Sequence, residues 1–294
     1  MNNKPVALVT DTGSSLSPEY GAKHGISILP LGVTIGEDEV GDKSEIADYK
    51  AFYGRLRKKE TSMSSCVNTE VFEQLFLDYF SKGQDVVYIG FSSGLSATFD
   101  NGAAAIAAAL EKYPDRKGYA VDTKCAALGQ GLLIDHVIGH IARNPNLTAA
   151  EIAQFAEKNS KHVIHLFTTD DLFFLMRGGR VSAGAAIAGS VLGLKPMMVI
   201  DDVGKIIKVG IERGRKNSIQ KLADNMEKHG YVPGKGKVFI SQGDCVEDAF
   251  LLETIIKHRY GVKEIFTDYL STVIGGHSGP GTVALFFFGN KRVV

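Results

Sequence analysis

The alternation of short apolar runs with helical patterns is the feature of this sequence that most constrains its fold. Residues 6–10, 86–91 and 118–122 have the length and apolar content of buried strands. Apolar residues at helical spacing lie between and after them, for example over residues 69–80 and 128–142. Strands connected through helices pair in parallel, because the crossover helix returns the chain to the same end of the sheet. The first half is therefore predicted to be a three-layer α/β domain with a parallel sheet.

The pattern changes after the Asn-Pro-Asn break at residues 144–146. Apolar runs at residues 196–200 and 205–211 are separated by Asp-Asp-Val-Gly, which predicts an antiparallel hairpin. Further helix and strand patterns follow, so the second sheet is expected to be mixed. We expect a parallel α/β domain over residues 1–160 and a mixed-sheet α/β domain over residues 161–294.

Charge and cysteine content exclude several classes of protein. The 33 Lys and Arg residues balance 33 Asp and Glu residues, which argues against a bulk electrostatic hold on nucleic acid or an anionic membrane. Cys66, Cys125 and Cys245 are widely spaced, so a reducing compartment is expected. The most apolar stretch, residues 183–194, is shorter than the roughly 18 residues that a membrane span needs. The sequence predicts a cytoplasmic protein without stable membrane insertion.

Three hydroxyl-rich segments lie where strands or extended runs end. They are residues 11–15, 61–65 and 92–96, and the last two are expected to lead into helices. Hydroxyls and unpaired amides at helix N-termini can hold an anionic head group such as a phosphate or a carboxylate. Serine and threonine also cap helices and fill turns without binding any ligand. Three such segments at one sheet edge favour a binding site.

One alternative is an esterase. Residues 90–94 match the G-x-S-x-G nucleophile elbow of α/β-hydrolases, and Ser92, Asp268 and His277 follow the triad order of that fold. A glycine-rich oxyanion loop is missing upstream, and few strands precede Ser92. A serine esterase that uses Ser92 stays open as the second interpretation.

Other polar clusters give weaker signals. His136 and His140 stand four residues apart near Asp135, but without a third ligand group a solvated helix face is the better interpretation, and no metal is expected. Residues 213–216 place basic side chains at a helix start, where cations oppose the helix dipole, which suggests a surface site for an anion or a partner. His277 lies in a glycine-rich loop that could hold an imidazole near a cleft.

Seven short segments follow one another in a specific order and spacing: Val9–Thr12, Thr61–Ser62, Ser92–Ser96, Val121–Thr123, Arg177–Arg180, Lys195–Pro196 and His277–Gly281. Taken together, these segments resemble the DegV family nearly from end to end. The resemblance implies two α/β domains that enclose one long-chain fatty acid such as palmitate, no catalysis by the protein alone, and no cofactor. It also implies a bacterial carrier that presents the acyl carboxylate to a fatty acid kinase for phospholipid synthesis.

The resemblance also implies roles for particular residues. Thr61 and Ser93 would donate hydrogen bonds to the carboxylate, with Ser62 and Ser92 beside them. The mouth of the site, which faces the kinase, would carry Arg213 and His277. Two departures from the family pattern bear on these roles: Met63 and Ser64 stand where the family usually has a proline and a glutamine, and Gly214 stands where it often has a threonine.

The acyl chain needs an apolar lining. Burial of a sixteen-carbon chain offers over ~10 kcal/mol of gross transfer free energy at about 0.8 kcal/mol per methylene. Candidate lining residues are Leu172, Phe173, Ile187 and Val191, with small residues over 183–189 leaving room between helices. Ordinary packing of helices on a sheet would use the same residues.

Overall fold

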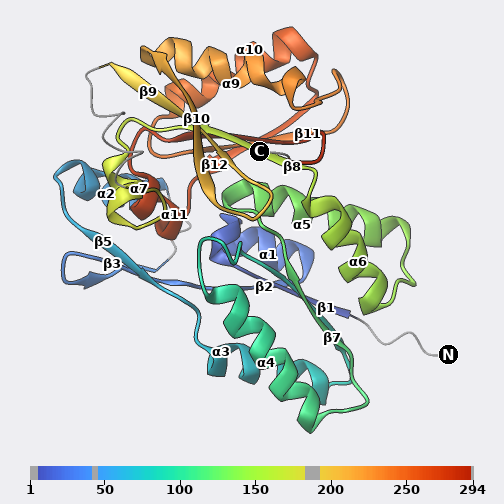
Figure 1. The fold of residues 1–294 in the computed structure, drawn as a ribbon. Coiled ribbons are helices and arrows are strands. Elements are labelled where there is room, and N and C mark those ends of the chain that lie inside the picture. The colour runs from blue at the N-terminus through green and yellow to red at the C-terminus, as the bar shows by residue number, and fades with distance from the viewer. Residues whose placement is uncertain (1–5, 42–45, 183–192, 293–294) are drawn as a thin grey trace.

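The computed structural model of the chain describes residues 6–41, 46–182 and 193–292, and these form five stacked layers (Figure 1). Two sheets alternate with three layers of helices, and the middle helical layer contacts both sheets. The predicted architecture, a parallel sheet followed by a mixed sheet in an α/β fold, is confirmed. None of the described helices is both long and apolar enough to cross a bilayer.

The first sheet has four parallel strands in the order β2-β1-β6-β7. Its strands are β1 Val6–Asp11, β2 Ile26–Leu29, β6 Asp85–Gly90 and β7 Gly118–Asp122. Side chains alternate between its faces, so Val9 packs in one apolar cluster with Phe72 and Phe76, and Leu8 packs in another with Leu132. Both faces of this sheet are therefore covered, as a parallel sheet requires.

Helices cover these two faces. One face carries α3 Thr69–Ser81 and α4 Thr98–Lys112, which also pack on each other. On the other side lie α1 Pro18–His24, α5 Ala127–Arg143 and α6 Ala149–Ser160. Helix α6 contacts β6 and β7, whereas α5 contacts the second sheet, so this pair forms the layer between the sheets.

The second sheet has six strands in the order β10-β9-β8-β13-β11-β12. Its strands are β8 Val163–Thr168, β9 Leu194–Ile200, β10 Ile206–Arg213, β11 Lys237–Gln242, β12 Glu264–Tyr269 and β13 Val283–Phe288. All neighbours pair antiparallel except β11 and β12. The predicted hairpin is the β9–β10 pair. Helices α9 Arg215–Lys228 and α10 Val246–Tyr260 cover the outer face, where Leu166 and Leu285 meet Leu222.

Smaller elements gather beside the two sheets. They are η1 Thr12–Ser14, α2 Ile46–Arg57, α7 Phe173–Arg177, α11 Thr272–Ser278 and a three-stranded sheet of β3 Gly32–Ile35, β4 Asp38–Glu39 and β5 Ser62–Ser65. Helix α11 contacts α7, β5 and α2 (Figure 1).

Two local predictions are wrong here. Residues 62–65 are a strand paired with β3 rather than a loop that leads directly into a helix. His277 lies in the last turn of α11 and not in an open loop. The helix forms despite its glycines because Gly275 and Gly276 let it approach Tyr53 and Ser62: an added Cβ would lie 2.2 Å from Tyr53 Oη and 2.5 Å from Ser62 Oγ.

Candidate ligand-binding site

An apolar cavity lies between the two sheets. It holds about 700 Å³ of empty space, part of which is open to solvent. Phe91 and Ala126, from loops that follow strands of the first sheet, form one wall. Phe167 and Phe286, on β8 and β13, form the opposite wall. The apolar walls suit an apolar ligand.

The lining is mostly apolar, and its polar side chains include Ser64, Ser96, Arg180 and His277. We call these four residues the polar cluster. Ser64 Oγ lies 2.7 Å from His277 Nε2, which joins β5 to α11. The Arg180 guanidinium donates through Nε to the carbonyl oxygen of Leu95, next to Ser96, at 3.2 Å. Segments that are more than 200 residues apart in the sequence therefore meet at this cluster.

The polar cluster has a positive charge without a matching carboxylate. Of the described residues that line the cavity, none is an aspartate or a glutamate. Burial lowers the pKa of Arg180 from its usual value, but a guanidinium stays charged at neutral pH. Burial and the nearby charges of Arg180 and Arg177 lower the pKa of His277 to about 4, so its imidazole is neutral. The cluster therefore suits one ligand carboxylate.

This arrangement predicts a change in the titration of His277 when a carboxylate binds. An anion within about 4–6 Å favours the imidazolium and raises a histidine pKa by roughly 1–3 units. We expect His277 to titrate near pH 4 in delipidated protein and higher once palmitate is added. Proton–nitrogen NMR of the ring measures both values, with the half-buried His140 of α5, which lies outside the cavity lining, as the internal control. Identical His277 titrations with and without bound palmitate would place the carboxylate elsewhere.

A second histidine lines the cavity within the apolar wall. His165 is buried, and its Nε2 accepts a hydrogen bond from the Ala126 amide at 3.2 Å. Its Nδ1 lies 3.1 Å from the Val163 carbonyl oxygen, to which it donates in this tautomer. Burial lowers the pKa of His165 to about 3. His165 is therefore a neutral, satisfied part of the wall.

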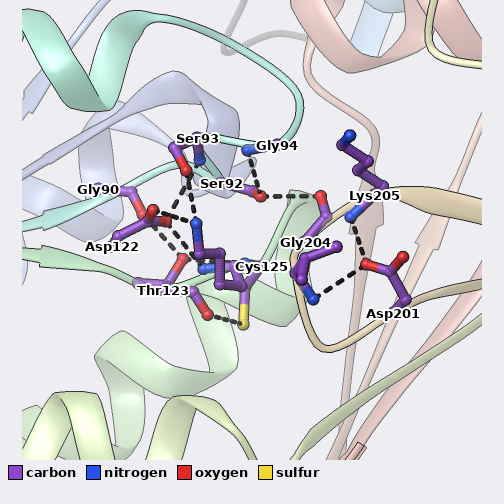
Figure 2. Close-up of polar contacts among 12 residues, drawn as sticks. Gly90, Ser92, Ser93, Gly94, Asp122, Thr123, Cys125, Asp201, Gly204 and Lys205 are labelled. Carbon is purple, nitrogen blue, oxygen red and sulfur yellow. Dashed lines mark hydrogen bonds and ion pairs between the residues drawn. The ribbon is translucent and has the colours of Figure 1, made fainter. Parts of the chain in front are cut away.

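The predicted carboxylate ligands Ser92 and Ser93 hold the loop after β6 in place (Figure 2). Ser92 Oγ donates to the Gly204 carbonyl oxygen at 2.8 Å, in the turn between β9 and β10. Ser93 Oγ accepts from Lys124 Nζ at 2.6 Å, and Lys124 also pairs with Asp122 at 2.6 Å. Both serines thus have protein partners, and Ser96 of the same loop lines the cavity. The carboxylate roles of Ser92 and Ser93 stay predictions.

The geometry does not support the esterase alternative. Ser92 is fully buried, and its hydroxyl is committed to the Gly204 carbonyl. The ring of His277 contacts Ser64 and not Ser92. Asp268 lies on the edge strand β12, where its carboxylate accepts the Tyr269 amide. The three residues therefore do not assemble into a nucleophile–base–acid relay.

Thr61 and Ser62, the other two predicted carboxylate ligands, lie near the cavity but not in its lining. Thr61 is exposed, and its carbonyl oxygen accepts the Gly36 amide at 3.0 Å. Ser62 is half-buried and packs against Gly276 of α11. Ser64, two residues further along β5 and on the same face, reaches the cavity. The carboxylate roles of Thr61 and Ser62 stay predictions.

The basic segment at the start of α9 divides into two parts. Arg213, at the end of β10, is exposed. Arg215 is held by two carboxylates, since its Nε lies 2.9 Å from Asp248 Oδ2 and its NH1 lies 3.6 Å from Asp170 Oδ1. These carboxylates offset the cost of a cation at the helix N-terminus, whereas Arg213 and Lys216 are the exposed cations of this segment.

The predicted lining residues occupy different environments. Leu172 is buried in the core cluster between the sheets, whereas the side chain of Phe173 is 48% exposed and contacts the Arg177 guanidinium. The cavity wall uses Leu175, one turn further along α7. Ile187 and Val191 lie outside the residues that the structure describes.

The two histidines of α5 pack on an aromatic ring. The ring centroids of His136 and His140 lie 5.1 Å and 3.8 Å from that of Phe155. Asp135 accepts hydrogen bonds from Tyr20 and Lys237. Across residues 6–41, 46–182 and 193–292, no group of three or more potential metal ligands comes together.

Comparisons with known proteins agree with this architecture. The chain matches the model of the family described as "Uncharacterised protein, DegV family" over residues 5–290. It is 38% identical to a DegV domain-containing protein from Clostridium perfringens over 291 residues, which are 98% of this chain and 99% of that protein.

Solved structures give the same fold. DegV, a fatty acid binding protein from Bacillus subtilis, is 27% identical with a TM-score of 0.80, over 98% of this chain and 100% of that one. The Streptococcus pneumoniae Fatty Acid Kinase (Fak) B3 protein, loaded with linoleic acid, has a TM-score of 0.84 at 18% identity, over 97% of this chain and 100% of that one. At 18% identity, the similarity to the Streptococcus pneumoniae protein shows a shared fold only. With the family model matched over nearly its whole length and a relative at 38% identity, the chain belongs to the DegV family.

Proposed function

We propose that this protein binds one long-chain fatty acid between its two sheets. The acyl chain occupies the apolar cavity, and the carboxylate lies at the polar cluster. The observation that carries this proposal is the lining itself: apolar walls, Arg180 as the cation, and no acidic residue among the described lining. The similarity to the fatty acid binding protein of Bacillus subtilis supports the same ligand class.

Palmitate is a suitable ligand on energetic grounds. Fourteen methylenes at about 0.8 kcal/mol each offer roughly 11 kcal/mol of gross transfer free energy. Arg180 adds an electrostatic attraction that a neutral lipid lacks. The polar groups of the cluster also give the carboxylate the hydrogen-bond donors that burial would otherwise remove.

The protein acts as a carrier and has no catalytic step of its own in this proposal. The polar cluster holds the carboxylate as an acceptor, and Arg213, which is exposed at the end of β10, is available to a fatty acid kinase or to the phosphate that it adds. Ser92 and Ser93 serve by fixing the loop that carries Ser96. The likeness of fold to a protein of the pneumococcal fatty acid kinase system supports the kinase partnership.

The proposal also includes a cytoplasmic location and a division of the chain into two domains. Cys66, Cys125 and Cys245 are free thiols, which agrees with a cytoplasmic setting. Residues 1–160 and 161–294 act as two domains, because the strands of the first sheet end at Asp122 and those of the second begin at Val163.

Titration of the delipidated protein with palmitate tests the proposal. Isothermal calorimetry is expected to show saturation at one palmitate per chain, because a single cavity joins the apolar walls to the polar cluster. A detergent with a large neutral head group, dodecyl maltoside, at equal concentration is the control for detergent-like adsorption. A protein that takes up no palmitate, or takes it up without saturation, would contradict the proposed function.

A further inference from the structure

Ser278 has a buried hydroxyl that no described residue satisfies. It is the last residue of α11, directly after His277, and its side chain lines the cavity. The residue is 5% exposed, and its Oγ has no hydrogen-bond partner among the described residues. A buried hydroxyl without a partner costs about 1–3 kcal/mol, and native proteins rarely leave one unpaired. Because the Ser278 side chain lines the cavity, a ligand group there can accept its hydrogen bond.

The backbone around Ser278 is fixed, so its hydroxyl stays directed at the cavity. The Ser278 carbonyl oxygen accepts from Thr169 Oγ1 at 2.8 Å and from Thr282 Oγ1 at 2.9 Å. Gly279 follows with a φ of +82°, a conformation that favours glycine, and ends the helix. Thr169 and Thr282 thus hold this turn, while the hydroxyl itself has no acceptor among the described residues.

The charge of the cavity indicates which kind of acceptor the Ser278 hydroxyl binds. Arg180 and the neutral His277 lie in the lining near Ser278, and the described lining has no acidic residue. A carboxylate is a stronger acceptor than water or an ester carbonyl, because charge-assisted hydrogen bonds are about twice as strong as neutral ones.

We infer that Ser278 donates a hydrogen bond to the carboxylate of the bound fatty acid and so selects the free acid over its neutral esters. This inference rests on the proposed function. In this inference, the Ser278 hydroxyl on α11 is a hydrogen-bond donor that acts beside the polar cluster and determines ligand specificity. It also explains why the last residue of this helix leaves a buried hydroxyl unpaired.

The test compares Ser278→Ala with Ser241→Ala. Ser241, on β11, is a fully buried serine whose Oγ also has no described partner, but it lies outside the cavity lining. We expect Ser278→Ala to weaken palmitate binding at least about tenfold and methyl palmitate binding less than about threefold. Ser241→Ala should change neither affinity. Melting temperatures of both variants verify folding, since each substitution removes an atom without a described partner.

A second measurement reports on the carboxylate itself. The carboxyl signal of palmitate labelled with carbon-13 at C1 should shift between wild type and Ser278→Ala, and remain unchanged in Ser241→Ala. Wild-type protein that binds palmitate while Ser278→Ala keeps the same affinity and carboxyl signal would overturn this inference alone. Equal losses for acid and ester in Ser278→Ala would also overturn it. Wild-type protein that binds no palmitate would overturn the proposed function as well.

Discussion

Replacement of Arg180 by glutamate is expected to lower the affinity for palmitate at least about 100-fold. Arg180 is the cation of the cavity lining, and the change places a second carboxylate beside that of the ligand. Two like charges about 4 Å apart repel by roughly 4 kcal/mol at an effective dielectric constant of 20. Calorimetry with palmitate measures this loss directly.

Neutral ligands and a distant arginine provide the controls for Arg180→Glu. Methyl palmitate has the same chain without the charge, so its affinity should fall by less than about threefold. Arg143→Glu makes the same charge change at an exposed site at the end of α5, and it should leave both affinities unchanged. A similar loss for acid and ester in Arg180→Glu would mean that the side chain acts through packing and that the carboxylate binds elsewhere.

Replacement of Arg292 by alanine is expected to destabilise the folded protein by about 3–5 kcal/mol. Arg292 is 6% exposed, and its guanidinium contacts the end of α6 and the loops that follow β7 and β9. It donates to the carbonyl oxygens of Ser160 at 3.0 Å, Thr123 at 3.2 Å and Asp201 at 3.3 Å, and also to that of Lys124. Its loss leaves these buried acceptors without that donor.

Thermal unfolding measures the effect of Arg292→Ala. At roughly 2–4 °C per kcal/mol, the melting temperature should fall by about 6–20 °C. Lys291→Ala, which removes the neighbouring basic side chain at an exposed position, should change it by no more than about 2 °C. Arg292 also holds the Asp201 turn, and the strands that flank this turn bring Ile200 and Ile206 to the cavity. Palmitate release should therefore be faster in Arg292→Ala. An unchanged melting temperature would show that the hydrogen bonds of Arg292 contribute little to the stability of the folded protein.

The layered fold could be predicted because its signal is local. Strand β7 has the predicted bounds, since short apolar runs between polar segments encode buried strands directly. The β9–β10 hairpin was predictable for the same reason. Helix α11 was not, because Gly275 and Gly276 lower helix propensity, and the helix gains its stability from contacts with Tyr53 and Ser62 that the sequence does not reveal.

The segments of the binding site could be predicted, but not which of their residues face the cavity. Residues 92–96 include three serines, and the sequence gives no means to rank them. The path of the chain after β6 directs Ser92 to Gly204 and brings Ser96 to the cavity. Arg180 belongs to the Arg-Gly-Gly-Arg segment at residues 177–180, which the sequence marks as part of the family resemblance. Its position in the lining depends on how the segment after α7 packs against the loop that contains Leu95, which is a tertiary contact.

Mass spectrometry of the purified protein tests the central claim most directly. Native spectra should show an excess mass over the chain, and denaturing spectra of the same sample should show the chain alone. Extraction of the released ligand should yield one long-chain fatty acid per protein molecule. A purified protein without excess mass that also takes up no added palmitate would contradict the account of this cavity as a fatty-acid site.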